Sequence, residues 1–257
     1  MDRATQIGIG FSLVVVIGAN VLEGGNPTSL LMLPAMLLVF GGTVGAAVAG
    51  GTMADAKNAV SSVKRALFWK PSPPADLVPV VVALADKARR EGLLTLEDAI
   101  ADVDDEFLGR AVRLVVDGTD PEELREILEA EMYAKKSEDK RSAKFFGDMG
   151  GYAPTIGIIG TVMGLVHVLE NLSQPDQLGH LIAGAFVATL WGVMTANLLW
   201  LPIGSRLGRL SELEMARMEV VIEGVMAVQA GANPRVVAQR LRSLLPASQR
   251  ETEAKAA

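Results

Sequence analysis

The sequence predicts an all-α membrane protein with four transmembrane helices and a helical cytoplasmic domain between the second and the third. Half of the 257 residues are hydrophobic. About 20 apolar residues span the hydrocarbon core of a bilayer. Four buried helices of a soluble bundle are the alternative, but soluble helices usually keep a polar stripe. Lys, Arg, Asp and Glu are absent from four stretches: residues 7–22, 28–50, 149–169 and 181–203.

The first two stretches predict an N-terminal transmembrane hairpin over residues 1–50. The first span covers about residues 6–22 and the second about residues 28–50, with EGGNP between them. A secretory leader is the alternative for the first span. Arg3 alone supplies basic charge before the apolar stretch, and no convincing cleavage site follows it. We therefore expect a retained hairpin.

Residues 51–146 predict a cytoplasmic domain of short helices. ADAKNAVSSVKRALFW has helical periodicity, and the three prolines of KPSPPAD end that helix. A long charged helix is expected to start at Pro121, capped by Asp120, and to run toward the third span. The domain holds 19 acidic and 15 basic residues, which suits contact with protein rather than anionic lipid headgroups. Between linker and long helix we expect helices over 77–92, 93–103 and 106–118.

Residues 147–204 predict a second transmembrane hairpin. Its spans are expected over about 149–170 and 181–203. The remainder, residues 205–257, begins with the amphipathic pattern RLGRLSELEMARMEVVIEGVMAVQAG, which predicts a cytoplasmic helix. The tail from Pro246 is polar and is expected to be disordered.

The basic residues predict the orientation in the membrane. Of the 24 Lys and Arg residues, Arg3 precedes the first span, 15 lie in residues 51–146, and eight follow residue 204. Positive residues are retained in the cytoplasm. We therefore expect both termini and the middle domain in the cytoplasm, and the connections 23–27 and 170–180 on the outside.

Several classes of function are disfavoured by composition. The chain has no cysteine, so disulfides and thiolate metal sites are excluded. A formal charge of −6 and a pI of about 5.1 argue against a nucleic-acid partner. No nucleophile–base pair, metal-ligand cluster or phosphate-binding loop stands out in the sequence. We expect no enzymatic activity, no cofactor and no metal.

Small residues recur at three- and four-residue spacing along the third and fourth spans. In lipid, helices associate through close backbone packing and interhelical hydrogen bonds rather than through hydrophobic burial. Helix packing is therefore the expected role of these glycines. They are Gly157, Gly160 and Gly164 in the third span and Gly184 and Gly192 in the fourth.

Two threonines and two prolines lie at matching depths in these spans. At 1.5 Å per residue, Thr161 and Thr189 both fall near the bilayer midplane. Their hydroxyls either bond their own backbones or line a hydrated seam. Pro154 and Pro202 lie toward the cytoplasmic ends, where each permits a bend. No span holds an ionisable residue in its interior, so an ion path would need a carboxylate from another chain.

The order of spans and three sequence motifs resemble the motility protein A (MotA) family of flagellar stator subunits. GGYAPTIGIIGTVMGLVHVLENLSQP (150–175) resembles the third-helix signature of the family, and GHLIAGAFVATLWGVMTANLLWLPI (179–203) the fourth. ALADKARREGLLTLED (83–98) resembles its cytoplasmic motif. MotA shares a superfamily with TolQ and ExbB, which lack the N-terminal hairpin.

The resemblance implies a multi-pass protein of the bacterial cytoplasmic (inner) membrane that forms an ion channel. It implies a homopentamer around a dimer of a MotB-like, single-span partner that supplies the ion-binding aspartate. Thr161 and Thr189 match the threonines of the ion path, and Pro154 and Pro202 match the two functional prolines. Arg89 and Glu97 match the charged pair that meets the rotor protein FliG, with Arg90 beside them as the other candidate for the basic contact.

Three functions follow as hypotheses. The first is a stator subunit that converts proton or sodium flow into flagellar rotation, in motility and chemotaxis. The second is a TolQ/ExbB-like energiser of envelope processes. The third is a scaffold or transporter subunit without ion current. A neighbouring gene for a peptidoglycan-binding partner favours the first, and one for a TonB- or TolR-like partner favours the second.

Overall fold

A computed structural model describes residues 4–70, 72–100 and 105–247, and all the secondary structure it describes there is helical. The chain divides into two compact units. Unit 1 comprises residues 1–70 and 139–209, and unit 2 comprises residues 71–138 and 210–257. Four of the described helices are long and apolar enough to cross a membrane. The all-helical fold class is confirmed.

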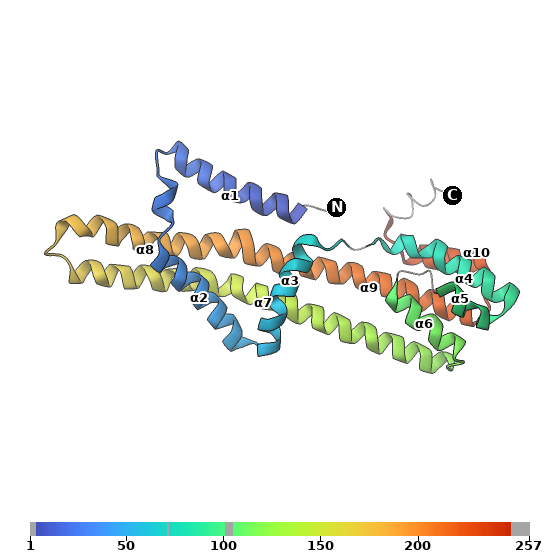
Figure 1. Ribbon diagram of the computed structural model, residues 1–257. Coiled ribbons are helices and arrows are strands. Elements are labelled where there is room, and N and C mark those ends of the chain that lie inside the picture. Colours follow the sequence, from blue (N-terminus) through green and yellow to red (C-terminus); the bar gives the residue numbers. More distant parts are fainter. Residues whose placement is uncertain (1–3, 71, 101–104, 248–257) are drawn as a thin grey trace. The chain divides into compact units, whose positions relative to one another are not determined.

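The N-terminal part of unit 1 contains three helices: α1 (Ala4–Leu22), α2 (Leu33–Gly50) and α3 (Met53–Phe68). The expected span over 28–50 begins five residues later than predicted, at Leu33. Residues Pro27–Leu30 form a separate 3-10 turn, η1, because the Asn26 side chain accepts a hydrogen bond from the Thr28 amide at 3.0 Å. The charge-free stretch therefore includes a capped turn in addition to the helix (Figure 1).

Helix α7 (Pro121–Glu170) has 50 residues and contains the third span. Its predicted start is confirmed, since the Asp120 carboxylate accepts a hydrogen bond from the Glu122 amide at 2.9 Å. Pro154 lies inside the helix without ending it. The amphipathic residues before the span and the apolar residues of the span thus belong to one helix.

The fourth span begins at Pro175, six residues before the expected position 181. Helix α8 (Pro175–Thr195) continues into a π-helical turn, η4 (Ala196–Trp200), and then into α9 (Leu201–Gln229). The Leu201 amide donates to the Ala196 carbonyl, five residues back. Pro202 has no amide hydrogen to donate, and a π-turn is a known way for a helix to accommodate such a break.

Helix α3 begins at the end of α2 and is fixed by polar contacts. Thr52 and Asp55 form a reciprocal capping box at its start. The hydrogen bonds from the Thr52 side chain and backbone lower the pKa of the Asp55 carboxyl below its usual range. Toward the other end, Arg65 forms a bidentate ion pair with Asp139 of α7, at 2.5 and 3.1 Å. Gln6 of α1 donates to the Leu67 carbonyl at 2.9 Å.

Unit 2 contains α4 (Leu77–Glu91), α5 (Leu96–Ile100), α6 (Glu106–Val116) and α10 (Pro234–Leu244), together with the start of α7 and the end of α9. Its core is formed by apolar side chains from all these helices, including Val81, Leu96, Leu108, Leu128, Val225 and Leu241. The expected helix over 93–103 begins three residues later than predicted, at Leu96. A 3-10 turn (Leu93–Thr95) precedes α5, and residues 101–103 lie outside the described residues.

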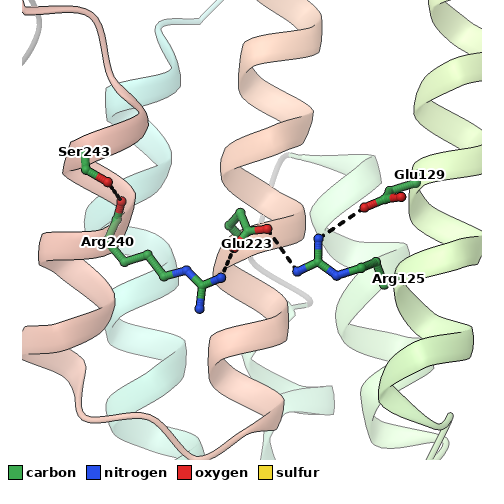
Figure 2. Close-up of polar contacts among 5 residues, drawn as sticks. All are labelled: Arg125, Glu129, Glu223, Arg240 and Ser243. Atoms are coloured by element: carbon green, nitrogen blue, oxygen red, sulfur yellow. Dashed lines mark hydrogen bonds and ion pairs between the residues drawn. The ribbon is translucent and has the colours of Figure 1, made fainter.

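Helix α10 was not predicted from the sequence. Asn233 caps it, with its side chain accepting a hydrogen bond from the Arg235 amide at 3.0 Å, and Pro234 occupies the first turn. Figure 2 shows how Glu223 of α9 joins this helix to α7. The Glu223 carboxylate accepts a hydrogen bond from Arg125 of α7 at 3.0 Å and another from Arg240 of α10.

Candidate functional site

The two threonines predicted for the ion path lie against each other in unit 1. The hydroxyls of Thr161 on α7 and Thr189 on α8 share a hydrogen bond. The Thr161 hydroxyl also lies 3.0 Å from the Ala185 carbonyl oxygen and 3.3 Å from that of Gly157. The Thr189 hydroxyl lies 3.2 Å from the same Gly157 oxygen. We call this pair, with the Gly157 and Ala185 carbonyls, the threonine site.

Glycines allow α7 and α8 to approach closely enough to form this site. A Cβ atom on Gly157 would stand 2.9 Å from the Ala188 carbonyl oxygen, and one on Gly192 would stand 2.6 Å from the Ala153 carbonyl oxygen. A Cβ on Gly160 or Gly164 would lie 2.6 Å from an alanine Cβ of α8. Each of these distances is too short for any other residue. Gly184 differs, because its neighbour is the flexible Met32 side chain at 3.1 Å.

The threonine site offers hydroxyl donors and carbonyl acceptors without a charge of its own. The first alternative for the hydroxyls is realised at Thr161, which bonds its own helix at Gly157 and also contacts the neighbouring helix at Ala185. A hydrated seam stays a prediction. Both side chains are half-buried. Oxygen groups of this kind suit a partly dehydrated cation or a carboxyl group, because the carbonyls accept hydrogen bonds and each hydroxyl can accept or donate one.

The two predicted hinge prolines are placed differently. Pro154 lies in α7, seven residues before Thr161, and is half-buried. Pro202 follows the π-turn and lines a pocket of about 370 Å³. The other walls of this pocket come from α1 and the π-turn, and include Thr5, Gly8, Ser12 and Asn197. The π-turn is the feature here that sequence reasoning missed, and Pro202 was its signal.

The predicted rotor-contact residues lie on the surface of unit 2. Arg89 and Arg90 occupy the last turn of α4, and both are exposed. Gly92 ends this helix with a φ of +94°, which favours glycine, and Glu97 follows in the first turn of α5. Arg90 pairs with Asp86 at 3.0 Å. Among the described residues, Arg89 and Glu97 form no ion pair.

Helix α10 places further residues, which were not predicted from the sequence, beside Arg89 and Arg90. Asp86, Arg89 and Arg90 line a pocket of about 420 Å³ together with Asn233, Pro234 and Arg235 from the start of α10. The Asn-Pro dipeptide, a common helix start, was the signal available in the sequence. Within the described part of the chain, no group of three or more His, Asp or Glu residues is arranged to hold a metal.

Comparisons with known proteins find two matching family models and close relatives over nearly the whole chain. Residues 6–92 match the family described as motility protein A N-terminal, and residues 99–220 match the MotA/TolQ/ExbB proton channel family. Motility protein A of Bacillus subtilis (strain 168) is 39% identical over 252 residues, covering 97% of this chain and 93% of that protein.

Two solved structures share the fold over nearly the whole chain. The flagellar MotAB stator complex from Bacillus subtilis superposes with a TM-score of 0.89 at 37% identity, covering 97% of this chain and 99% of the other. The C. jejuni MotAB structure superposes with a TM-score of 0.90 at 29% identity, covering 96% and 97%.

Proposed function

Because this chain belongs to the motility protein A family, within the MotA/TolQ/ExbB proton channels, we propose that it acts as the ring-forming subunit of a flagellar stator. In this role it forms an ion channel with a MotB-like partner and converts ion flow into torque on the rotor. The four apolar spans support a place in the bacterial inner membrane. The positions of Lys and Arg support a cytoplasmic location for both termini.

The threonine site is the observation that carries this proposal. Thr161 and Thr189 bring two hydroxyls together in a span pair whose interior holds no Lys, Arg, Asp or Glu. A carboxylate that enters such an apolar seam needs donors close by, because unpaired burial of a charge is costly. The MotB-like partner supplies that aspartate, and the threonine hydroxyls stabilise its charge after one ion has been released and before the next one binds.

The mechanism requires the ring formed by this chain to move against the partner in small steps. One elementary charge that crosses 100 mV releases about 2.3 kcal/mol, enough to shift a modest conformational equilibrium. Pro202 is the residue best placed to take up such a step, since the π-turn before it already departs from α-helical register. Pro154 lies toward the cytoplasmic end of the third span, as Pro202 does in the fourth, and is the second candidate hinge.

Torque passes to the rotor through exposed charges of unit 2. Arg89, Arg90 and Glu97 form the contact with FliG in this proposal, and the exposure of all three supports it. Exposed ion pairs contribute about 0–1 kcal/mol each, so such a contact forms and breaks repeatedly. Arg235 lies in the same pocket wall as Arg89 and extends the basic face.

The experiment is complementation of a strain that lacks the gene. The native chain is expected to restore swimming, Thr189→Ala to abolish it, and Thr155→Ala to leave it intact. Thr155 is the matched control because its exposed hydroxyl bonds only the Tyr152 carbonyl of its own helix, at 2.8 Å. Normal swimming of the deletion strain, or of Thr189→Ala, would contradict the proposal. A deletion strain with envelope defects and normal motility would support the TolQ/ExbB-like alternative.

A further inference from the structure

The outward face of helix α3 carries an unusual alternation of apolar and basic side chains. Spacings of three and four residues place five side chains on one face of a helix. Those at both ends and at the middle are apolar, and the two between them are lysines. The stripe consists of Met53, Lys57, Val60, Lys64 and Phe68.

Every member of this stripe faces away from the core of unit 1. Met53, Val60 and Phe68 are 64%, 78% and 67% exposed, although all three are large and apolar. The two lysines are exposed as well. The opposite face of α3 is buried at Ser62 and Ala66. One face of the helix is therefore packed against unit 1, and no residue in the described part of the chain covers the outer face.

The direction of α3 places this stripe at the level of the membrane boundary. The helix starts three residues after α2 ends at Gly50. Figure 1 shows α3 crossing the α7 ribbon instead of lying along it. The ion pair of Arg65 with Asp139, and the buried apolar cluster that Ala66 shares with Phe145 and Phe146, hold it just before the third span begins. A helix that crosses a transmembrane bundle at this height runs along the bilayer surface.

The local charge is basic, although the charge of the surrounding domain is not. Residues 53–70 hold four basic residues and one acid. Arg65 is committed to Asp139, and its guanidinium carbon also lies 5.0 Å from the centre of the Trp69 ring. The free positive charge therefore comes from Lys57 and Lys64 on the stripe and from Lys70 just beyond the helix. The average over residues 51–146, which favours contact with protein, does not describe α3.

From these observations we infer that the α3 stripe binds anionic phospholipid headgroups at the cytoplasmic surface of the bilayer. Met53, Val60 and Phe68 enter the boundary between headgroups and acyl chains, as the apolar face of an interfacial helix does. The stems of Lys57 and Lys64 lie along the same apolar surface while their ammonium groups reach the phosphates. Trp69, at the end of the helix, suits the same interface. The inference rests on the membrane orientation given in the proposed function.

The test is lipid retention by the full-length chain with its partner, purified and studied by native mass spectrometry with added phosphatidylglycerol or phosphatidylcholine. The native chain is expected to retain phosphatidylglycerol in preference. Lys57→Gln with Lys64→Gln is expected to weaken that retention about thirtyfold, from about 1 kcal/mol for each lysine near an anionic surface. The matched control, Lys87→Gln with Lys136→Gln, removes the same charge from unit 2 and is expected to retain the lipid.

Four results would overturn the inference. The first three are equal retention of both lipids by the native chain, native-like retention of phosphatidylglycerol by the Lys57 and Lys64 variant, and an equal loss in both double variants. A fourth is a changed number of subunits at unchanged lipid per chain, which would assign the stripe to a second copy of the chain. Swimming is scored separately, so a chain that binds the lipid but fails in complementation contradicts the stator proposal alone.

Discussion

Arg65 and Asp139 join α3 to α7 through two hydrogen bonds, with the Asp139 side chain only 4% exposed and that of Arg65 24% exposed. Removing one charge from a buried pair leaves the other without compensation, which costs several kcal/mol. Asp139→Asn is therefore expected to destabilise the chain by about 3 kcal/mol, measured by thermal unfolding in detergent. Glu138→Gln, one residue away and exposed, is the control. A loss no larger than that of the control would show that the pair does not stabilise α3.

The glycine contact between α7 and α8 predicts a steric effect. In Gly157→Ala the new methyl group meets the backbone of α8, which cannot move aside as a side chain does. We expect a loss of about 1–3 kcal/mol in unfolding free energy, as for other overpacked sites. Gly151→Ala in the same helix, where no atom lies within 4 Å of the added Cβ, is expected to be neutral. Equal unfolding midpoints for the two variants would argue against close packing at Gly157.

The π-turn before Pro202 predicts that stability and function oppose each other at this position. Pro202→Ala restores an amide donor and allows regular α-helical register, which favours the helix by up to about 3 kcal/mol. We expect a higher unfolding temperature and a loss of swimming in the same variant. Pro34→Ala is the control, because Pro34 lies in the first turn of α2, where its missing amide hydrogen costs nothing. A variant that gains stability and still swims would exclude a hinge at Pro202.

The Glu223 bridge predicts that α10 depends on one carboxylate. Glu223 accepts hydrogen bonds from Arg125 and Arg240, and bonding to Glu223 and then to Glu129 raises the pKa of the Arg125 guanidinium. Both arginines are more than one third exposed, so solvent screening limits the cost of Glu223→Gln to about 1 kcal/mol. Faster hydrogen exchange in α10 is the expected readout. Glu129→Gln should leave that exchange unchanged, since Glu129 contacts only Arg125 among these residues.

The absence of cysteine from the chain allows a direct test of its orientation. Single cysteines are introduced at Ser173, between α7 and α8, and at Glu138, before the third span; both positions are exposed. A membrane-impermeant maleimide added to intact spheroplasts is expected to label Ser173→Cys alone. Labelling of Glu138→Cys without lysis would reverse the proposed topology.

Charge patterning predicted the membrane architecture well because exclusion of charge from hydrocarbon is a strong, local constraint. The ends of the spans were less predictable. An apolar stretch does not distinguish a capped turn such as Pro27–Leu30 from the first turn of a helix. The π-turn at Ala196–Trp200 was also invisible, since its register depends on where the Pro202 ring can be accommodated against neighbouring helices.

The candidate sites, like the spans, were predicted only in part from the sequence. Depth along two helices correctly suggested that Thr161 and Thr189 lie at one level, but the hydrogen bonds between them depend on the rotation of α7 against α8. That rotation is set by which glycines face each other, and spacing alone does not give it. Arg235 was missed because α10 was missed, and its place beside Arg89 results from the packing of unit 2. The stripe on α3 was not recognised in the sequence because the charges were counted over the whole of residues 51–146.

The threonine site contains fewer hydrogens than its oxygens can accept. Two hydroxyl groups carry two protons, yet they lie within reach of the Gly157 oxygen, the Ala185 oxygen and each other. Several proton arrangements therefore share one set of heavy-atom positions, and rotation about a single C–O bond exchanges them. The two hydroxyl groups can therefore re-orient within nanoseconds toward a carboxyl group of the partner, protonated or ionised, while α7 and α8 stay in place.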